Sequence, residues 1–258
     1  DTLNTPFGYG TYASRHAAVG AVAVYNSLQK IKEKARRVGA HMLEADVEDV
    51  VFEGGKAFVK GAPDNAKTIQ EIAGAAALGY DRPEGEEPFL DDTTYYDPPD
   101  CTFPFGTHIA VVEIDSATGE VKLERYIAVD DVGKVINPMI VDGQVHGGIA
   151  QGIAQALWEH GTYDESGQLT TSSLMDYAFP KAEFFPSFEV DRTETPTDVN
   201  PMGVKGAGET GTIASSAAVV NAVMDALAPL GIRHLDMPLT PERVWRAMGE
   251  AKSEGGEA

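Results

Sequence analysis

The sequence predicts an α+β fold in which mixed sheets pack against helices. Three patterns support this prediction. Apolar residues recur at alternating steps of three and four over residues 14–38, which is the spacing of a helix with one buried stripe. Two pairs of short β-rich runs are each joined by a turn, as in hairpins. Three more segments of helical length follow the second pair.

Residues 1–95 are expected to form a first subdomain made of a loop, a long helix, a hairpin and a short helix. Ser14 can cap the long helix, which we expect to end near Val38. The hairpin turns at residues 53–56. Thr68 stands three residues before a glutamate, which is the spacing of a capping box and therefore the start of the short helix.

Residues 96–248 are expected to form a second subdomain, reached through an arm rich in proline and acidic residues. Its hairpin pairs residues 107–115 with 121–129. The apolar residues of these runs alternate in places and are continuous in others, so at least one face is buried. A helix over residues 142–161 follows, in which Gly148 leaves room for another backbone.

The last part of the chain predicts two more helices and a tail. A loop rich in proline and glycine at residues 196–212 leads into a helix at 213–227. The Thr-Pro pair at 240–241 fits the N-cap and first position of a final helix. Residues 249–258 are expected to be a flexible tail.

Composition excludes several classes of function. With 43% hydrophobic and 23% charged residues, the chain is typical of a soluble globular protein. Forty acidic and twenty basic residues give a net charge of -20, which repels phosphate backbones, so nucleic acid is not an expected partner. We also expect no transmembrane segment, because no apolar run approaches the length needed, and the N-terminus lacks the pattern of a signal peptide.

Cysteine and histidine usage argues against a metal site made by side chains. Cys101 is the single cysteine, so no internal disulfide forms and no Cys-x-x-Cys pair can hold zinc or an iron–sulfur cluster. A reducing compartment, the cytoplasm, is expected. The six histidines show no paired ligand spacing, and the chain has no Gly-x-Ser-x-Gly elbow. Zinc enzymes and serine hydrolases are therefore not indicated.

Three glycine-rich stretches, at residues 8–14, 143–148 and 203–211, are each expected to be a loop that leads into a helix. Such loops expose backbone N–H groups at the positive end of a helix dipole, where anions such as pyrophosphate bind. One such loop usually only makes a turn. Three in one chain favour a cofactor that carries phosphates.

The third stretch contains Gly206 and Gly208 in the spacing Gly-x-Gly-x-x-Gly of a dinucleotide site. That site also needs a buried strand before it and a second strand ending in an acid, and the sequence predicts neither. A nicotinamide site is therefore a weak interpretation. Glu209 lies within this stretch. From the residues alone it is a solvated acid or one stabilised by the following helix N-terminus, although its glycine neighbours would let a ligand come close.

Four motifs taken together resemble a known family. They are TYAS at 11–14, VDDVGKVINP at 129–138, DGQVHGGIAQG at 142–152 and GVKGAGETG at 203–211. In this order they resemble the C-terminal, molybdopterin-binding part of the large subunit of the molybdenum hydroxylases. This family includes xanthine dehydrogenase, aldehyde oxidase and aerobic carbon monoxide dehydrogenase. The resemblance covers essentially the whole chain.

The resemblance implies a cofactor and the residues that contact it. The cofactor is molybdenum on a pterin dithiolene, expected in the cytosine dinucleotide form, so the protein itself supplies no metal ligand. Glu209 matches the family's catalytic carboxylate, a general base. His16 stands where some relatives have serine or threonine. The implied cofactor-binding positions are Thr11, Ala13, Ser14, His16, Gln144, Lys205, Gly206, Ala207 and Gly208.

The resemblance also implies an activity and partners. The enzyme would oxidise an aldehyde, an N-heterocycle or carbon monoxide with oxygen from water, and the residues around Glu209 look more like the aldehyde and heterocycle group. Electrons would pass to 2Fe-2S clusters and FAD on an iron–sulfur subunit and a flavin subunit. The N-terminal half of the molybdenum subunit would supply the other wall of the pocket. The alternative is a non-catalytic cofactor-carrying or assembly module.

Overall fold

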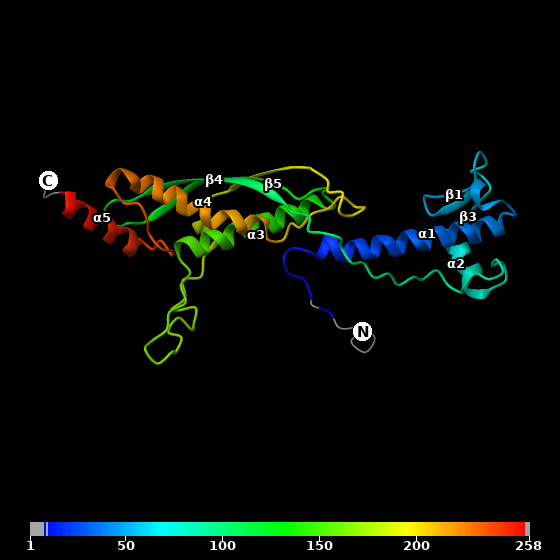
Figure 1. Cartoon of the computed structure of the whole chain (residues 1–258), viewed down its shortest axis with the longest axis horizontal. Coiled ribbons are helices and arrows are strands. Elements are labelled where there is room, and N and C mark those ends of the chain that lie inside the picture. Colours follow the sequence, from blue (N-terminus) through cyan, green and yellow to red (C-terminus); the bar gives the residue numbers. More distant parts are fainter. Residues whose placement is uncertain (1–7, 9, 256–258) are drawn as a thin grey trace. The chain divides into compact units, whose positions relative to one another are not determined.

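The computed structural model describes residue 8 and residues 10–255 (Figure 1). The chain forms two compact units, one comprising the chain up to Ala18 and from Pro99 onward, the other Val19–Pro98. The predicted first subdomain, residues 1–95, included the N-terminal loop. In the structure the described part of that loop belongs with the unit that starts at Pro99, where Ser14 is hydrogen-bonded to Glu209.

The unit Val19–Pro98 consists of a long helix packed on a small antiparallel sheet with the strand order β1-β2-β3. Its core contains the fully buried side chains of Val38, Ala57 and Ile72. Gly39 lets α1 approach the sheet, because a Cβ there would lie 2.5 Å from Ala57 Cβ. The elements are α1 (Val22–Met42), η2 (Val47–Asp49), β1 (Val50–Glu53), β2 (Lys56–Val59), β3 (Ala66–Thr68) and α2 (Ile69–Leu78).

The expected hairpin and capping box are both present in this unit. Glu53 pairs with Lys56 across the β1–β2 turn. Thr68 Oγ1 accepts a hydrogen bond from the Glu71 N–H at 3.3 Å, and Glu71 Oε2 accepts one from the Thr68 N–H at 2.8 Å. These two bonds satisfy backbone donors at the start of α2, as the sequence pattern predicts.

The prediction that Ser14 caps the long helix is wrong. The helix begins with a π-helical turn, η1 (His16–Ala21), and continues as α1 with Ala21 at its N-cap and no side-chain cap. Ser14 has a φ of 55°, and its hydroxyl is bonded to Glu209 instead. A tertiary hydrogen bond has therefore replaced the local one.

The other unit packs helices on one face of a mixed sheet. Strands β4 and β5 are antiparallel, and β5 and β6 are parallel. Figure 1 shows α3 and α4 side by side along β4 and β5. This arrangement confirms the α+β prediction. The elements are β4 (Phe105–Ile114), β5 (Val121–Asp131), α3 (Pro138–Leu157), η3 (Ala182–Phe184), β6 (Phe188–Thr193), α4 (Thr210–Leu227), η4 (Ala228–Leu230) and α5 (Pro241–Gly255).

Glycines bring α3 and α4 into backbone contact. A Cβ on Gly148 would lie 2.8 Å from Thr212 N, and one on Gly211 would lie 2.3 Å from Val145 O. A Cβ on Gly152 would likewise meet the residues one turn further along α4. Because the paired positions rise together along both chains, the two helices are parallel. Their N-termini therefore point toward the same end of the unit.

Three expected boundaries differ from the structure. Helix α3 begins at Pro138 rather than 142, because Asn137 Oδ1 accepts a hydrogen bond from the Ile140 N–H at 3.3 Å. Residues 143–148 are therefore inside a helix and are not a loop that leads into one. Helix α4 begins at Thr210 rather than 213, and α5 continues to Gly255, where a tail was expected from residue 249.

Among residues 8 and 10–255, one segment, Thr210–Leu230, is long and apolar enough to cross a bilayer when judged by length and composition alone. It comprises α4 and the turn after it. Core helices of soluble proteins meet the same test, and Val219, Val223 and Leu227 are buried against the sheet and α3. Of the apolar window in this segment, 22% is buried.

Candidate functional site

The N-terminal loop holds Glu209 through Ser14. Ala13 and Ser14 have φ angles of 51° and 55°, in the left-handed region that non-glycine residues seldom adopt. This conformation lets Ser14 Oγ donate to Glu209 Oε2 at 2.6 Å and accept from the Glu209 N–H at 2.9 Å. One hydroxyl thus fixes both the backbone and the carboxylate of Glu209. Residues 195 positions apart in sequence form this contact.

Glu209 occupies the N-cap of α4 and is exposed. Its carbonyl oxygen accepts hydrogen bonds from the N–H groups of Thr212 and Ile213, both at 3.1 Å. Its side chain does not cap its own helix, since it is turned toward Ser14.

Two glycines allow the surrounding chain segments to converge. A Cβ on Gly206 would lie 2.7 Å from Ser14 Cβ and 2.9 Å from Ser14 O, so only glycine fits there without a shift. A Cβ on Gly208 would lie 3.5 Å from both Ser14 Oγ and Gln144 Oε1. The N-terminal loop, α3 and the loop before α4 therefore meet beside an exposed carboxylate.

A buried ion pair fixes the loop before α4 to the end of β5. Lys205 Nζ lies 3.2 Å from Asp131 Oδ1, with side-chain exposures of 7% and 0%. Burial acts to raise the pKa of Asp131, but the hydrogen bonds that the carboxylate accepts outweigh burial and lower it. The donors to Asp131 are Gly133, Thr193, Thr195 and Lys205.

Asn200 fixes the same loop a few residues earlier. Its buried amide donates to Val204 O at 2.9 Å and accepts from the N–H groups of Met202 and Val204. No sequence pattern indicated Asn200, and Asp131 stood out only as part of the motif at 129–138. A polar side chain within a loop that must be buried is the signal that could have indicated both.

The structure brings together five of the ten predicted site residues. Ser14, Gln144, Gly206, Gly208 and Glu209 converge as described above. The other five are placed next to this group in sequence, without a described contact to the Glu209 carboxylate. Of these, Thr11 Oγ1 in the N-terminal loop and His16 Nδ1 at the start of η1 lie 3.4 Å apart, and both residues are exposed. The remaining three are Ala13, Lys205 and Ala207.

Lys205 is among the predicted cofactor-binding residues, but its ammonium group points into the protein. It is bonded to Asp131 and lies 4.7 Å from the centre of the Phe105 ring. Only the backbone of Lys205 remains as a possible contact for a ligand. Among the described residues, no group of three or more His, Cys, Asp or Glu side chains could hold a metal ion.

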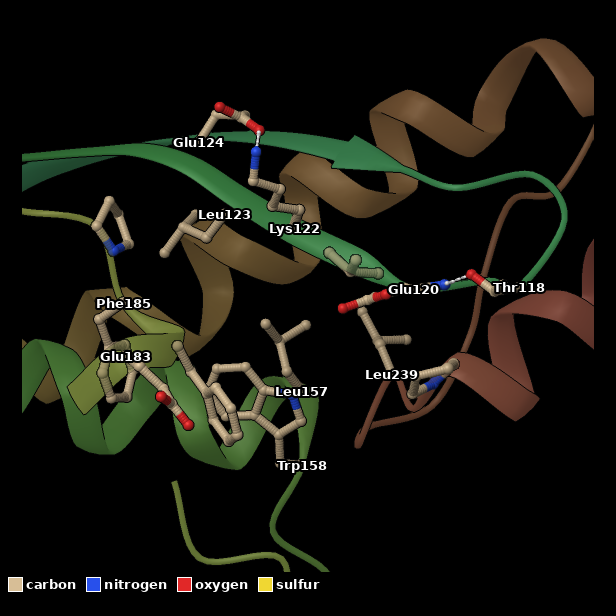
Figure 2. Close-up of a pocket in the computed structure, with 14 residues that line it drawn as sticks. Thr118, Glu120, Lys122, Leu123, Glu124, Leu157, Trp158, Glu183, Phe185 and Leu239 are labelled. Atoms are coloured by element: carbon tan, nitrogen blue, oxygen red, sulfur yellow. Dashed lines mark hydrogen bonds and ion pairs between the residues drawn. The ribbon is translucent and has the colours of Figure 1, made fainter. Parts of the chain in front are cut away.

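A separate cavity of about 650 Å³ lies at the other end of strand β5, and Figure 2 shows its lining. Its floor is apolar, with Leu123, Leu157 and Leu239, and the carboxylates of Glu120 and Glu183 are part of its lining. Strand β5 extends from Val121 beside this cavity to Asp131 beside the Glu209 loop. At about 3.3 Å per residue, the two ends are roughly 30 Å apart, so the cavity and the carboxylate are different places.

Comparisons with known proteins cover nearly the whole chain. The family model described as a molybdopterin cofactor-binding domain matches residues 1–186. The carbon monoxide dehydrogenase large chain of Hydrogenophaga pseudoflava is 44% identical over 97% of this chain and 31% of its own length. The nicotine 6-hydroxylase large subunit of Paenarthrobacter nicotinovorans is 42% identical over 93% of this chain and 30% of its own length.

A solved structure has the same fold. The CO dehydrogenase from Oligotropha carboxidovorans superimposes with a TM-score of 0.91 and 39% identity, covering 98% of this chain and 31% of that one. The chain therefore spans less than a third of the length of these relatives.

Proposed function

The chain belongs to the molybdopterin cofactor-binding family and corresponds to the C-terminal part of a molybdenum hydroxylase large subunit, and we propose that it forms one wall of the active site. In this proposal Glu209, on that wall, is the general base. The observation that carries the proposal is the position of this carboxylate. It is exposed at a helix N-terminus, held by Ser14, and next to Gly208, which is also exposed.

The residues present fit an anionic, phosphorylated pterin. Helices α3 and α4 are parallel, so the positive ends of both dipoles point to the same end of the unit. Gly208 is exposed at that end, and Gly206, which is buried against Ser14, lets the loop come close to the N-terminal segment. Gln144 contributes an amide that can donate to and accept from a ring or a phosphate. The backbone around Lys205 and Ala207, and the loop with Thr11, Ala13 and His16, complete the proposed contacts.

Each residue then has a simple task in the reaction. When bound, the molybdenum pterin supplies the two-electron oxidation of the substrate. Glu209 accepts a proton from the water-derived nucleophile whose oxygen enters the product, which requires an anionic carboxylate within hydrogen-bond reach. Ser14 keeps that carboxylate in one orientation, since it bonds both the carboxylate oxygen and the backbone N–H.

The proposal includes the rest of the enzyme. The proposed substrate is an aldehyde, an N-heterocycle or carbon monoxide, and the proposed cofactor form is the cytosine dinucleotide. We include an iron–sulfur subunit with 2Fe-2S clusters, a flavin subunit with FAD, and the N-terminal half of the molybdenum subunit. Support comes from the length of the relatives, of which this chain covers 31% and 30%. A cytoplasmic location is proposed from the single cysteine, Cys101.

Substitution Glu209→Gln in the complete enzyme tests the assignment. Gln keeps the size and the contact with Ser14 but cannot accept the proton, so we expect unchanged molybdenum and pterin content with turnover reduced by about a hundredfold or more. Glu242→Gln is the matched control, because Glu242 is also an exposed glutamate at the start of a helix and should be replaceable without loss.

Two results would contradict the proposal in different ways. A fully active Glu209→Gln enzyme would show that this carboxylate is not the base. A wild-type complex that retains the pterin but oxidises no aldehyde, N-heterocycle or carbon monoxide would favour the alternative, a non-catalytic cofactor-carrying or assembly module.

A further inference from the structure

We propose that the buried ion pair between Asp131 and Lys205 is a positioning device that sets where the Glu209 carboxylate stands. The inference rests on the proposed role of Glu209 as the base. Asp131 and Lys205 would not touch the substrate or the cofactor through their side chains. They would act through the loop that connects them to Glu209.

The burial of this pair needs an explanation other than stability. The side chains are 7% and 0% exposed, and removing two charges from water costs about as much as their attraction returns. Apolar residues of similar size often stabilise a fold equally well at such sites. Compared with apolar side chains, an ion pair restricts geometry more tightly, because the carboxylate and the ammonium group interact well in only a narrow range of relative positions.

Asp131 is itself held rigidly at the end of β5. It accepts hydrogen bonds from the Gly133 N–H at 3.0 Å and from Thr193 Oγ1 at 3.0 Å, in addition to its contact with Lys205. Thr193 is the last residue of β6, so the carboxylate joins two neighbouring strands. The anchor is therefore part of the sheet and not of a loop.

The loop runs directly over this anchor. The Lys205 N–H donates to Val132 O at 2.9 Å, and Gly133 and Val204 form an isolated antiparallel bridge. A Cβ on Gly133 would lie 2.5 Å from Gly203 O, so the two segments are already at contact distance. Lys205 thus has its backbone fixed to residue 132 and its side chain fixed to residue 131.

A short path leads from Lys205 to the carboxylate. Gly206 is the next residue, and a Cβ there would overlap Ser14 at 2.7 Å. Ser14 in turn bonds the Glu209 carboxylate at 2.6 Å. Because these groups are already in van der Waals or hydrogen-bond contact, a shift of the backbone at Lys205 has to move Ser14, Glu209 or both.

Phe105 completes the arrangement. Its ring covers the ammonium group of Lys205 at 4.7 Å from the ring centre, which adds a cation–π contact. The ring helps to keep water from the ion pair, and the Coulomb attraction between the two charges is stronger where the effective dielectric constant is lower. The same cover explains why the lysine is not available as a phosphate ligand in spite of its place in a glycine-rich loop.

The test compares three variants of the complete enzyme with Arg125→Met as the matched control. Arg125 also pairs with a carboxylate on sheet β4-β5-β6, Glu189, but that pair is 58% and 51% exposed. Lys205→Met and Asp131→Asn should each lower kcat by about tenfold to a hundredfold, the size of loss expected from a misplacement of about 1 Å. KM and molybdenum content should stay unchanged, because the loss is in the transition state.

The double variant, Asp131→Asn with Lys205→Met, separates positioning from stability. With no unpaired buried charge, its unfolding temperature should return toward that of the wild type, while kcat stays low. If kcat recovers together with the unfolding temperature, the pair is only structural and the inference is wrong. The inference is also wrong if Lys205→Met has the kcat of the wild type, or if Arg125→Met loses as much kcat as Lys205→Met.

The Glu209→Gln variant tells the failure of this inference from the failure of the proposed function. A fully active Glu209→Gln enzyme would contradict both proposals. An inactive Glu209→Gln enzyme together with a fully active Lys205→Met enzyme would contradict only this inference.

Discussion

Alanine at Gly148 should push the two helices of the site apart, whereas alanine at the neighbouring Gly147 should not. A Cβ on Gly148 would lie 2.8 Å from Thr212 N and 3.0 Å from Gly211 Cα. Around Gly147 nothing lies within 4 Å of the added Cβ. Both positions are inside α3, so the gain in helix propensity is about the same for both, roughly 0.5–1 kcal/mol.

The size of the effect follows from the contact distances. Atoms at 2.8 and 3.0 Å must retreat to about 3.4 Å, so the helices separate by roughly half an ångström, and overpacking of this kind costs about 1–3 kcal/mol. The atoms that retreat are backbone atoms and cannot rotate away. We therefore expect Gly148→Ala to be less stable than Gly147→Ala by about 1–3 kcal/mol, which is the overpacking cost alone, because the propensity gain is common to both variants and cancels.

Urea unfolding of the two variants measures this difference, and turnover measures its consequence at the site. Thr212 N is bonded to Glu209 O, so spreading the helices also displaces the base, and Gly148→Ala should lose about tenfold or more in kcat. Equal stability of the two variants would refute the close packing of α3 on α4. Normal turnover in a destabilised Gly148→Ala enzyme would refute the link from this packing to Glu209.

Three further predictions concern single side chains. Ser14→Ala removes both hydrogen bonds to Glu209, so kcat should fall with little change in molybdenum content, and an unaltered kcat would contradict the role of the hydroxyl. Tyr126→Phe leaves the buried His108 Nδ1 without its 2.8 Å partner and should cost about 1–3 kcal/mol in urea unfolding, whereas a neutral result would show that this bond adds nothing. The folded pKa of Asp131 is lowered, so its contribution to stability is present above its unfolded pKa of about 3.8 and is lost as pH falls through the folded value. Asp131→Asn should therefore flatten the acid side of a stability–pH curve below about pH 4, and an unchanged curve would contradict the assignment.

Local patterns predicted the elements whose determinants are close in sequence. The Thr68–Glu71 capping box and the Glu53–Lys56 turn each depend on residues at most three positions apart, and both are present. The start of α3 was missed, although Asn137 and a following proline are an N-cap signal, because the run of glycines was interpreted as a loop. In the structure those glycines serve the contact with α4.

Features that depend on distant residues could not be predicted. Ser14 has the usual identity of a helix cap, and only the fold shows that its partner is Glu209, 195 positions away. Likewise, a lysine in a glycine-rich loop suggests a phosphate ligand, yet Lys205 is directed to Asp131, 74 positions earlier. In both cases a tertiary contact outcompeted the local role that the residue type favours.

The position of the molybdenum atom relative to Glu209 is the most direct test of the account. Anomalous diffraction from crystals of the complete enzyme would locate the metal without any assumption about the pterin. We predict that it lies within reach of the Glu209 carboxylate through one hydrogen-bonded group, roughly 3–5 Å away. A metal more than about 10 Å from that carboxylate, beyond reach of even one bridging water, would contradict the central claim.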